Sequence, residues 1–227
     1  MTQAPRQYTA LVTGGARGIG RAIVEELQAS GVSVLAPPRR ELDLAAVQSV
    51  ESWLLSHRDE KVDILVNNAG TNVLNAVADI ELATWEAMVQ VNLGAVLRLV
   101  QTFAPGMVAR GWGRILNLSS IFSLVTRERR AAYSMTKAAL NALTRSAAVE
   151  YGPGGVLVNA LAPGYVDTDL TRANNSPEAL ERIRGLIPLR RLASVAELAR
   201  IAGFLVSEAN SYLTGQVVVV DGGFTCL

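Results

Sequence analysis

The chain has 227 residues, of which 50% are hydrophobic, so it fits one α/β domain with a buried core. Its 21 Lys and Arg nearly balance its 20 Asp and Glu, which excludes the basic excess of a general nucleic-acid binder. The single cysteine, Cys226, excludes an intramolecular disulfide, and together with the absence of a recognisable secretion signal it favours a cytoplasmic setting.

Short apolar runs alternate with longer stretches of helical period, which predicts βαβ units and a parallel sheet. Most of the runs are continuously apolar, as expected of strands that helices cover on both faces. The predicted strands are Tyr8–Val12, Val32–Ala36, a short one near Leu42, Ile64–Val66, Arg114–Leu118, Val156–Ala160 and Val217–Val220. The predicted helices are Gly18–Ala29, Ala45–His57, Thr84–Arg110, Ala131–Tyr151 and Val195–Ser207. The fold class is therefore α/β, a Rossmann-type doubly wound sheet of seven parallel strands in one domain over residues 1–227.

A glycine-rich stretch, TGGARGIG from Thr13 to Gly20, directly follows the first predicted strand and opens the first predicted helix. Glycine allows a sharp bend and a close approach of the backbone, and the N–H groups at a helix N-terminus attract a diphosphate. A tight turn without a ligand is the alternative interpretation. The position of the TGGARGIG stretch in the first βαβ unit favours a dinucleotide-binding turn.

A Tyr-x-x-x-Lys pair lies in the predicted helix AAYSMTKAAL, where Tyr133 and Lys137 are one turn apart on one face. The plainer interpretation is an inward aromatic ring beside a solvated lysine. An ammonium 4 Å from a phenol at an effective dielectric of 20 favours phenolate by about 4 kcal/mol, an upper limit of roughly three pKa units. We therefore expect Lys137 to lower the pKa of Tyr133.

These motifs together resemble the short-chain dehydrogenase/reductase family over almost the whole chain, as far as VDGG at 220–223. The resemblance rests on the glycine spacing, NNAG at Asn67–Gly70, Ser120 thirteen residues before Tyr133, the Tyr-x-x-x-Lys pair and APG at Ala162–Gly164. It implies an NAD(P)-dependent enzyme that interconverts a carbonyl and a secondary alcohol, close to the 3-oxoacyl-thioester reductases. It also implies a homotetramer or homodimer packed through the two long helices.

The resemblance assigns roles to individual residues. Tyr133 becomes the acid and base, Ser120 holds the substrate oxygen, Lys137 binds the nicotinamide ribose, and the Asn92 backbone carbonyl holds a water in a proton relay. The alternatives are that Ser120, like Ser119, satisfies a strand end and that Asn92 marks a helix kink. The residues expected at the cofactor are Gly14, Arg17, Gly18, Ile19, Gly20, Arg39, Asp43, Leu44, Asn68, Ala69, Gly70, Tyr133, Lys137, Pro163, Gly164, Val166 and Thr168.

The segment after the second strand, VLAPPRREL, lacks the acidic residue of an NAD-preferring site. Arg39 follows two prolines there, and Arg39 with Arg17 suits a 2′-phosphate, which predicts NADP(H) rather than NAD(H). A solvated loop is the alternative. The prolines also exclude the helix that the family has before its third strand, so the adenosine pocket is expected to be shortened and open.

No metal is expected, because the only histidine, His57, has no clustered carboxylate or thiol, and no Gly-x-Ser-x-Gly elbow supports a hydrolase. A membrane span is not expected either, since polar residues and Pro105 interrupt the most apolar helix. The rival functions are an idle cofactor-binding module, an NAD-preferring alcohol dehydrogenase, and an epimerase or dehydratase.

The substrate is expected between the segment after Ser120 and a mobile lid over 169–189. The candidate apolar lining is Phe122, Leu124, Leu186 and Ile187. The run RERR at Arg127–Arg130 is either a solvated surface or a site for an anionic substrate or carrier.

Overall fold

The fold is known from a computed structural model that describes residues 7–173 and 175–226. Within these residues, six parallel strands form one sheet in the order β2-β1-β3-β4-β5-β6. The strands are β1 (Thr9–Val12), β2 (Ser33–Leu35), β3 (Ile64–Asn67), β4 (Gly113–Leu118), β5 (Val156–Pro163) and β6 (Val217–Val220). The helices are α1 (Gly18–Ala29), α2 (Val47–His57), α3 (Leu82–Val89), α4 (Ala95–Ala109), α5 (Ala131–Tyr151), α6 (Asp169–Ala173), α7 (Pro177–Leu186) and α8 (Val195–Val206).

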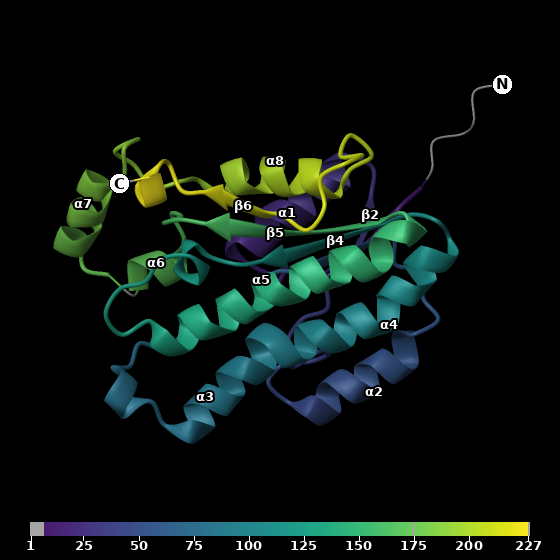
Figure 1. Ribbon diagram of the computed structural model, residues 1–227, viewed down its shortest axis with the longest axis horizontal. Helices are drawn as coiled ribbons and strands as arrows, with labels where there is room; N and C mark the ends of the chain where they lie inside the picture. Colours follow the sequence, from purple (N-terminus) through teal and green to yellow (C-terminus); the bar gives the residue numbers. More distant parts are fainter. Residues whose placement is uncertain (1–6, 174, 227) are drawn as a thin grey trace.

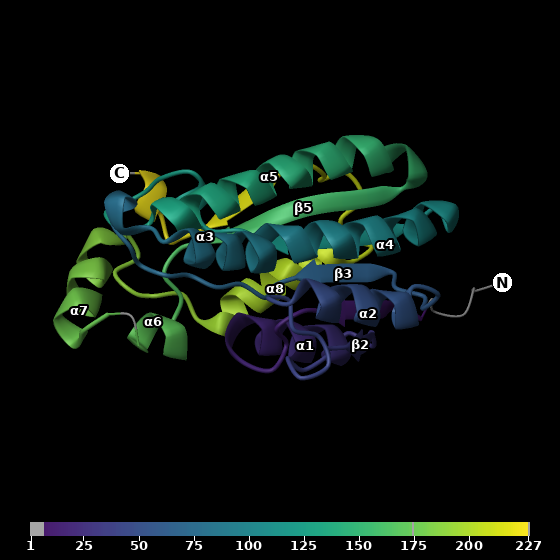
Figure 2. The same cartoon turned by 90° about the horizontal axis from the view of Figure 1, so that it is seen from below.

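Helices cover both faces of the sheet, as the continuously apolar strands predict (Figures 1 and 2). One apolar core lies between the sheet and α2, α4 and α5, and includes Leu99, Phe103 and Leu140. The other lies between the sheet and α1 and α8, and includes Ile23 and Leu198. The predicted doubly wound α/β fold is confirmed.

The carboxyl ends of the strands face one end of the molecule, where α6 and α7 also lie, at the left of Figure 1. The chain runs from β1 to β2 on one side of the sheet and then to β3 on the other side of β1. Ligands of such sheets bind beyond the strand ends where the order reverses. This end of the molecule is therefore the place to look for the site.

The predicted seventh strand near Leu42 is wrong. After Pro37 and Pro38 the chain makes a turn in which Leu42 N–H donates to the Pro38 carbonyl, at 3.1 Å, and Leu42 is buried against the α2 side of the sheet. Proline donates no ladder hydrogen bond, so the segment from Pro37 turns instead of pairing. The predicted absence of a regular helix between Pro37 and Leu42 is confirmed.

The single helix predicted over Thr84–Arg110 is three segments, because a π-helical turn, Gln90–Gly94, separates α3 from α4. By length and composition the stretch Leu82–Ala109 could cross a membrane: its 18-residue window has a mean hydropathy of 1.2, and 44% of that window is buried. Leu99, Phe103 and Met107 on this stretch pack into the core of the sheet. Its apolar character is accounted for by this packing.

A ladder of buried polar side chains joins two central strands to the helix that carries the Tyr-x-x-x-Lys pair. Asn67 Nδ2 on β3 donates to Asn117 Oδ1 on β4 at 2.8 Å, and Asn117 Nδ2 donates to Thr144 Oγ1 on α5 at 2.9 Å. All three residues are buried. Buried polar groups require partners, so this ladder fixes α5 relative to β3 and β4.

Candidate active site

The glycine turn after β1 has the backbone that its sequence requires. Gly14 and Gly18 have φ values of +66° and +55°, in the left-handed region that favours glycine. A Cβ on Gly20 would lie 2.3 Å from both the Gly14 carbonyl oxygen and Asn68 Nδ2. Gly20 is thus required by close packing within the turn, whereas Gly14 is exposed and free to face a ligand.

The NNAG segment is held against this turn by Thr13, a residue absent from the predicted cofactor site. Thr13 Oγ1 accepts the backbone N–H groups of Asn68 and Ala69, each at 3.1 Å. Asn68 Nδ2 in turn donates to the carbonyls of Thr13 and Gly14, at 2.9 and 3.1 Å. The first residue of the TGGARGIG motif therefore shapes the crevice between β1 and β3. A threonine hydroxyl at the end of the first strand was the sequence feature that could have indicated this role.

Ser120 and Tyr133 come together beyond the end of β4. The Ser120 hydroxyl hydrogen-bonds the Tyr133 side chain, which lowers the pKa of Tyr133, and the positive charge of Arg130 acts in the same direction. Burial is the largest influence and raises the pKa of Tyr133 above its ordinary value. At neutral pH the phenol is therefore held as the protonated acid.

Lys137 is 3% exposed, and its Nζ donates a hydrogen bond to the Leu118 carbonyl at 2.6 Å. Nζ lies 5.7 Å from the centre of the Tyr133 ring. Burial lowers the pKa of Lys137 to about 8. The pKa of Tyr133 is raised because burial outweighs the groups that act to lower it, Ser120 and Arg130, and the expected lowering by Lys137 stays a prediction.

The two neighbouring serines have different partners. Ser119 Oγ donates to Asn141 Oδ1 at 2.6 Å within the protein interior, so its hydroxyl is occupied. Ser120 Oγ accepts the Phe122 N–H at 3.2 Å and also meets Tyr133. Ser120 thus satisfies a backbone N–H at the strand end, as the plainer interpretation held, and its hydroxyl still faces the Tyr133 phenol.

Asn92 lies inside the π-helical turn, which agrees with the interpretation of a helix irregularity. Its side chain is buried and fully used, with Oδ1 accepting Thr71 N–H at 2.8 Å and Nδ2 donating to the Thr71 carbonyl at 2.9 Å. Nδ2 also donates to Thr136 Oγ1 on α5, at 3.0 Å. A Cβ on Gly70 would lie 3.3 Å from Asn92 Oδ1 and 3.5 Å from Lys137 Nζ, so the three residues adjoin.

The residues expected to bind the adenosine part lie in an exposed turn. Arg39 Nη2 pairs with Asp43 Oδ2 at 3.3 Å, and Arg17 is also exposed, directly before α1. Leu44 is different, because its side chain is buried in the core and its carbonyl accepts Gln90 Nε2 at 3.2 Å. An NADP phosphate would meet Arg39 only after that arginine leaves, or shares, Asp43.

The segment after β5 closes the other side of the crevice. Val166 is buried and bridges Ala193, whereas Thr168 Oγ1 accepts the Thr171 N–H at 3.2 Å and begins α6. A Cβ on Gly18 would lie 3.9 Å from Thr168 Cγ2, so this segment faces the glycine turn. The arrangement leaves the exposed Gly14 and the Thr168 segment around a backbone cradle that suits a dinucleotide.

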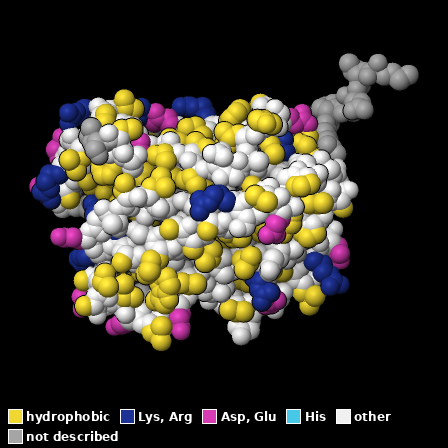
Figure 3. Space-filling view, viewed as in Figure 1, with side chains coloured by type: hydrophobic (Ala, Val, Ile, Leu, Met, Phe, Trp, Pro, Cys, Tyr) yellow, Lys and Arg dark blue, Asp and Glu magenta, His cyan; other side chains and the backbone are white. Residues whose placement is uncertain are grey.

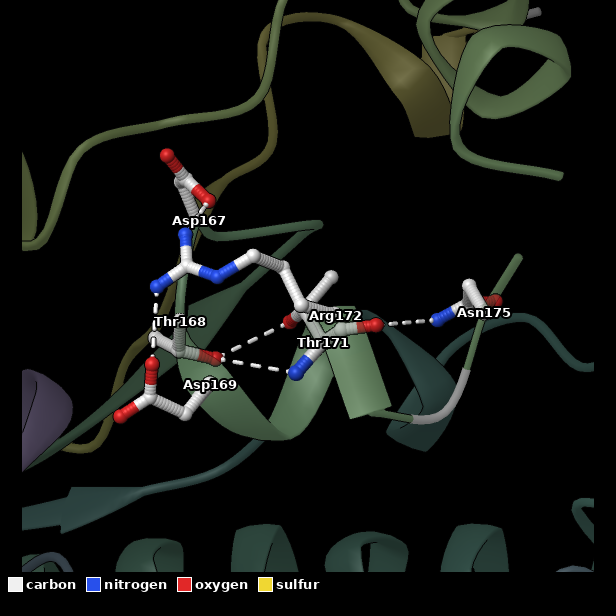
Figure 4. A network of polar contacts seen from close by, with 6 residues as sticks. All are labelled: Asp167, Thr168, Asp169, Thr171, Arg172 and Asn175. Carbon is white, nitrogen blue, oxygen red and sulfur yellow. Dashed lines mark hydrogen bonds and ion pairs between the residues drawn. The ribbon is translucent and has the colours of Figure 1, made fainter. Parts of the chain in front are cut away.

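The segment 169–189 forms α6 and α7, and Asn174 within it lies outside the described residues. Arg172 on α6 lies between Asp167 and Asp169, with Nη2 2.9 Å from Asp169 Oδ1 (Figure 4). Asn175 Nδ2 donates to the Thr171 carbonyl at 2.8 Å. These exposed contacts tie the beginning of the segment to the strand end, and whether it moves as a lid stays a prediction.

Apolar side chains from α7 pack on the segment after Ser120. Phe122 and Ile187 are buried in one core cluster, whereas Leu124 and Leu186 are exposed, and a role of any of the four in lining the substrate site stays a prediction. The cluster also contains residues that the sequence did not single out, Tyr165, Ile183 and Leu192, and Tyr133 packs on its edge.

The run RERR is not uniformly solvated. Arg127, Glu128 and Arg129 are exposed, but Arg130 is 5% exposed, and its guanidinium carbon lies 4.8 Å from the centre of the Phe122 ring. Arg129 donates to the Leu74 carbonyl at 3.0 Å. Arg130 belongs to the run that the sequence offered as either a solvated surface or a site for an anionic group, and the structure buries Arg130 while the other three residues stay exposed.

No group of three His, Cys, Asp or Glu within the described residues could hold a metal ion. The functional side chains at this end of the sheet are hydroxyls, a phenol, an amine and guanidinium groups. They can exchange a proton and bind anionic groups.

Comparison with known proteins matches residues 14–225 to the model of a family described as enoyl-(acyl carrier protein) reductase. The 3-oxoacyl-(acyl-carrier-protein) reductase FabG of Aquifex aeolicus is 38% identical over 94% of this chain and 95% of its own. A gluconate 5-dehydrogenase from Burkholderia cenocepacia, solved with NADP and tartrate, superposes with a TM-score of 0.91 at 32% identity, over 97% and 96% of the two chains. A putative NAD(P)-dependent gluconate 5-dehydrogenase from Beutenbergia cavernae, with bound NADP, has a TM-score of 0.89 at 34% identity, over 99% of both.

Proposed function

The chain belongs to the short-chain dehydrogenase/reductase family of NAD(P)-dependent oxidoreductases, and we propose that it interconverts a carbonyl and a secondary alcohol with Tyr133 as acid and base. The observation that carries the proposal is the approach of the Ser120 hydroxyl to the Tyr133 phenol beyond β4, where it acts to lower the pKa of Tyr133, with Lys137 buried one turn further along α5. A phenol, a hydroxyl and an amine converge there next to a cradle for a dinucleotide.

During reduction, the Tyr133 hydroxyl donates its proton to the substrate oxygen. The Ser120 hydroxyl donates a second hydrogen bond to the same oxygen and stabilises the charge that develops on it. During oxidation, Tyr133 accepts the proton instead. Asn92 and Lys137 adjoin at Gly70, which supports a role for this pair in passing the proton onward.

NADP(H) is the proposed cofactor, and it supplies or accepts the hydride. The exposed Gly14, the positive φ of Gly18 and the facing Thr168 support its diphosphate and nicotinamide ends. Arg39 and Arg17, both exposed on the β2 side of the crevice, are the groups proposed to bind the 2′-phosphate. The NADP bound in the Beutenbergia and Burkholderia structures supports the same choice over NAD(H).

The experiment is a survey of ketones with the purified protein, following loss of NADPH absorbance, with Tyr133→Phe as the test variant. Phenylalanine keeps the ring and removes the proton, so we expect kcat to fall about 10²- to 10⁴-fold while NADPH binding is retained. Turnover that persists in Tyr133→Phe would remove Tyr133 from the mechanism. NADPH binding without turnover of any ketone or alcohol would instead favour the idle module.

A homotetramer or homodimer through α4 and α5 is proposed as the assembly. The exposed side of α5 carries Met135, Ala138, Ala142 and Val149 at spacings of three, four and seven residues, which places them on one stripe. Apolar side chains are spread over this face of the molecule, and most charged ones lie towards its edges (Figure 3). Sedimentation velocity of the wild type and of Val149→Glu tests the interface, and a wild-type monomer would exclude it.

A further inference from the structure

Arg130 is a buried cation whose side chain has no hydrogen-bond acceptor or carboxylate partner among residues 7–173 and 175–226. Its guanidinium lies 4.8 Å from the centre of the Phe122 ring, and its Nε is buried with no hydrogen-bond acceptor. Among the residues that the structure describes, no carboxylate lies within ion-pair distance of it. Arg127 brings a second guanidinium to the same place, 5.9 Å from the Phe122 ring and 5.7 Å from the Tyr165 ring.

The other buried basic groups of this chain are treated differently. Arg114, also 5% exposed, donates to the carbonyls of Gly113 and Asn210 at 2.8 and 2.9 Å. Lys137, 3% exposed, donates to the Leu118 carbonyl at 2.6 Å. These two buried cations thus donate hydrogen bonds to carbonyl oxygens, whereas the buried Nε of Arg130 has no acceptor among the described residues.

An unpaired charge in an apolar site costs free energy, and a second like charge adds to the cost. Burial and the charge of Arg127 both lower the pKa of Arg130, because both destabilise its charged form. The ring of Phe122 offsets part of this cost for Arg130, and the ring of Tyr165 does so for Arg127, but a cation–π contact leaves the guanidinium N–H groups without an acceptor. An anion between the two guanidinium groups would relieve the setting.

Arg130 stands immediately before α5, three residues ahead of Tyr133, and its charge acts on the Tyr133 hydroxyl. An anionic group bound by Arg130 would therefore adjoin the group that exchanges the proton. The surrounding cluster of Phe122, Tyr165 and Ile187 is apolar, which suits a short organic acid more than a heavily hydrated ion.

We propose that Arg130, assisted by Arg127, binds the carboxylate of the substrate, so that the preferred substrates are short oxo acids and the matching hydroxy acids. The planar guanidinium fork matches a carboxylate with two parallel hydrogen bonds. The assignment rests on the proposed function for the position of the reacting carbonyl beside Tyr133. A thioester gives Arg130 no charge to pair with and is the disfavoured substrate class.

The kinetic test compares linear 2-, 3- and 4-oxo acids with their primary amides, which have nearly the same shape but no charge. Because Arg130 also acts on Tyr133, Arg130→Gln should slow turnover of both compounds, but we expect it to lower kcat/KM about 10- to 100-fold more for the best acid than for its amide. Arg130→Lys keeps the charge but lacks the planar fork, so its kcat/KM for the acid should lie between those of the wild type and Arg130→Gln. Arg58→Gln, an exposed arginine at the end of α2, is the matched control for loss of one positive charge.

A binding test needs no turnover. With NADPH present, butanoate should raise the Tm of the wild type and of Arg58→Gln but not that of Arg130→Gln, and butanamide should have no such selectivity. If ketones are reduced but acid and amide lose equally in Arg130→Gln, the carboxylate site is wrong and the proposed function stands. If no ketone is reduced while butanoate protection depends on Arg130, the carboxylate site stands and the proposed function fails.

Discussion

The ammonium of Lys137 donates a 2.6 Å hydrogen bond to the Leu118 carbonyl at the end of β4, although the lysine is almost wholly buried. The cation is thereby anchored to the same strand end that leads into Ser120. Burial lowers the pKa of Lys137 to about 8, so its charge in the ligand-free enzyme is sensitive to mildly alkaline pH. Several measurable properties depend on this contact and its neighbours.

Stability should depend on pH through Lys137. Between pH about 8 and its ordinary value of 10.5, the unfolded chain holds a proton that the folded protein has lost. The Lys137 contribution to the free energy of unfolding therefore rises with pH across this window. Lys137→Met should be more stable than the wild type at pH 7 by about 1 to 2 kcal/mol, and this advantage should shrink towards pH 10.

Urea unfolding of the ligand-free proteins at pH 7, 8, 9 and 10 measures the effect. The range stops at pH 10 because the raised pKa of Tyr133 acts in the opposite sense above the ordinary tyrosine value. A constant difference between wild type and Lys137→Met at all four values would mean that the folded protein keeps its ammonium solvated.

The two adjacent serines should separate catalysis from stability. Ser120→Ala removes the hydrogen bond that lowers the pKa of Tyr133, so the apparent pKa in the kcat profile should rise and kcat should fall about 10²-fold. Ser119→Ala leaves the buried Asn141 Oδ1 without its donor and should lower the free energy of unfolding by about 1 to 3 kcal/mol. Equal losses of kcat in the two variants would contradict the assignment.

Gly20→Ala should disrupt the cofactor cradle. The new methyl group would lie 2.3 Å from the Gly14 carbonyl oxygen, so the turn must shift, at a cost of about 1 to 3 kcal/mol in stability and with weaker NADPH binding. Gly152→Ala is the control, because its Cβ would meet nothing within 4 Å. Titration of NADPH fluorescence measures both, and unchanged binding by Gly20→Ala would show that the turn does not hold the dinucleotide.

Arg39→Asp should alter cofactor preference. If Arg39 binds the 2′-phosphate, kcat/KM for NADPH should fall about 10- to 100-fold while that for NADH holds or rises. Arg58→Asp supplies the same change of charge on an exposed site remote from the crevice. A ratio of NADPH to NADH use that matches the wild type in Arg39→Asp would leave Arg39 as a partner of Asp43 only.

Much of the fold could be predicted because the spacing of apolar residues distinguishes helices from buried strands. Strands such as β3 and β4 are buried along their whole length and mostly apolar, and α5 agrees with its predicted bounds. The segment around Leu42 was mistaken for a strand because two buried leucines look alike in a turn and in a sheet. The π-helical turn at Gln90–Gly94 could not be recognised from the spacing of apolar residues.

For the site, motif spacing correctly brought Ser120 and Tyr133 together, because both follow from strand ends and helical turns. Spacing could not give the direction of the Tyr133 pKa, which depends on how deeply the ring is buried. Nor could it separate Arg130 from the rest of its charged run, because the burial of that arginine depends on its packing against the Phe122 ring.

The Asn67–Asn117–Thr144 ladder has a further consequence for the geometry of the reaction. Apolar packing alone tolerates a small slide of a helix along a sheet, but paired amides match only in one register. Tyr133 and Lys137 share α5 with the last rung, about two to three turns away. By fixing the register of α5 on the sheet, the ladder thus sets how far the Tyr133 phenol extends beyond the carboxyl ends of the strands.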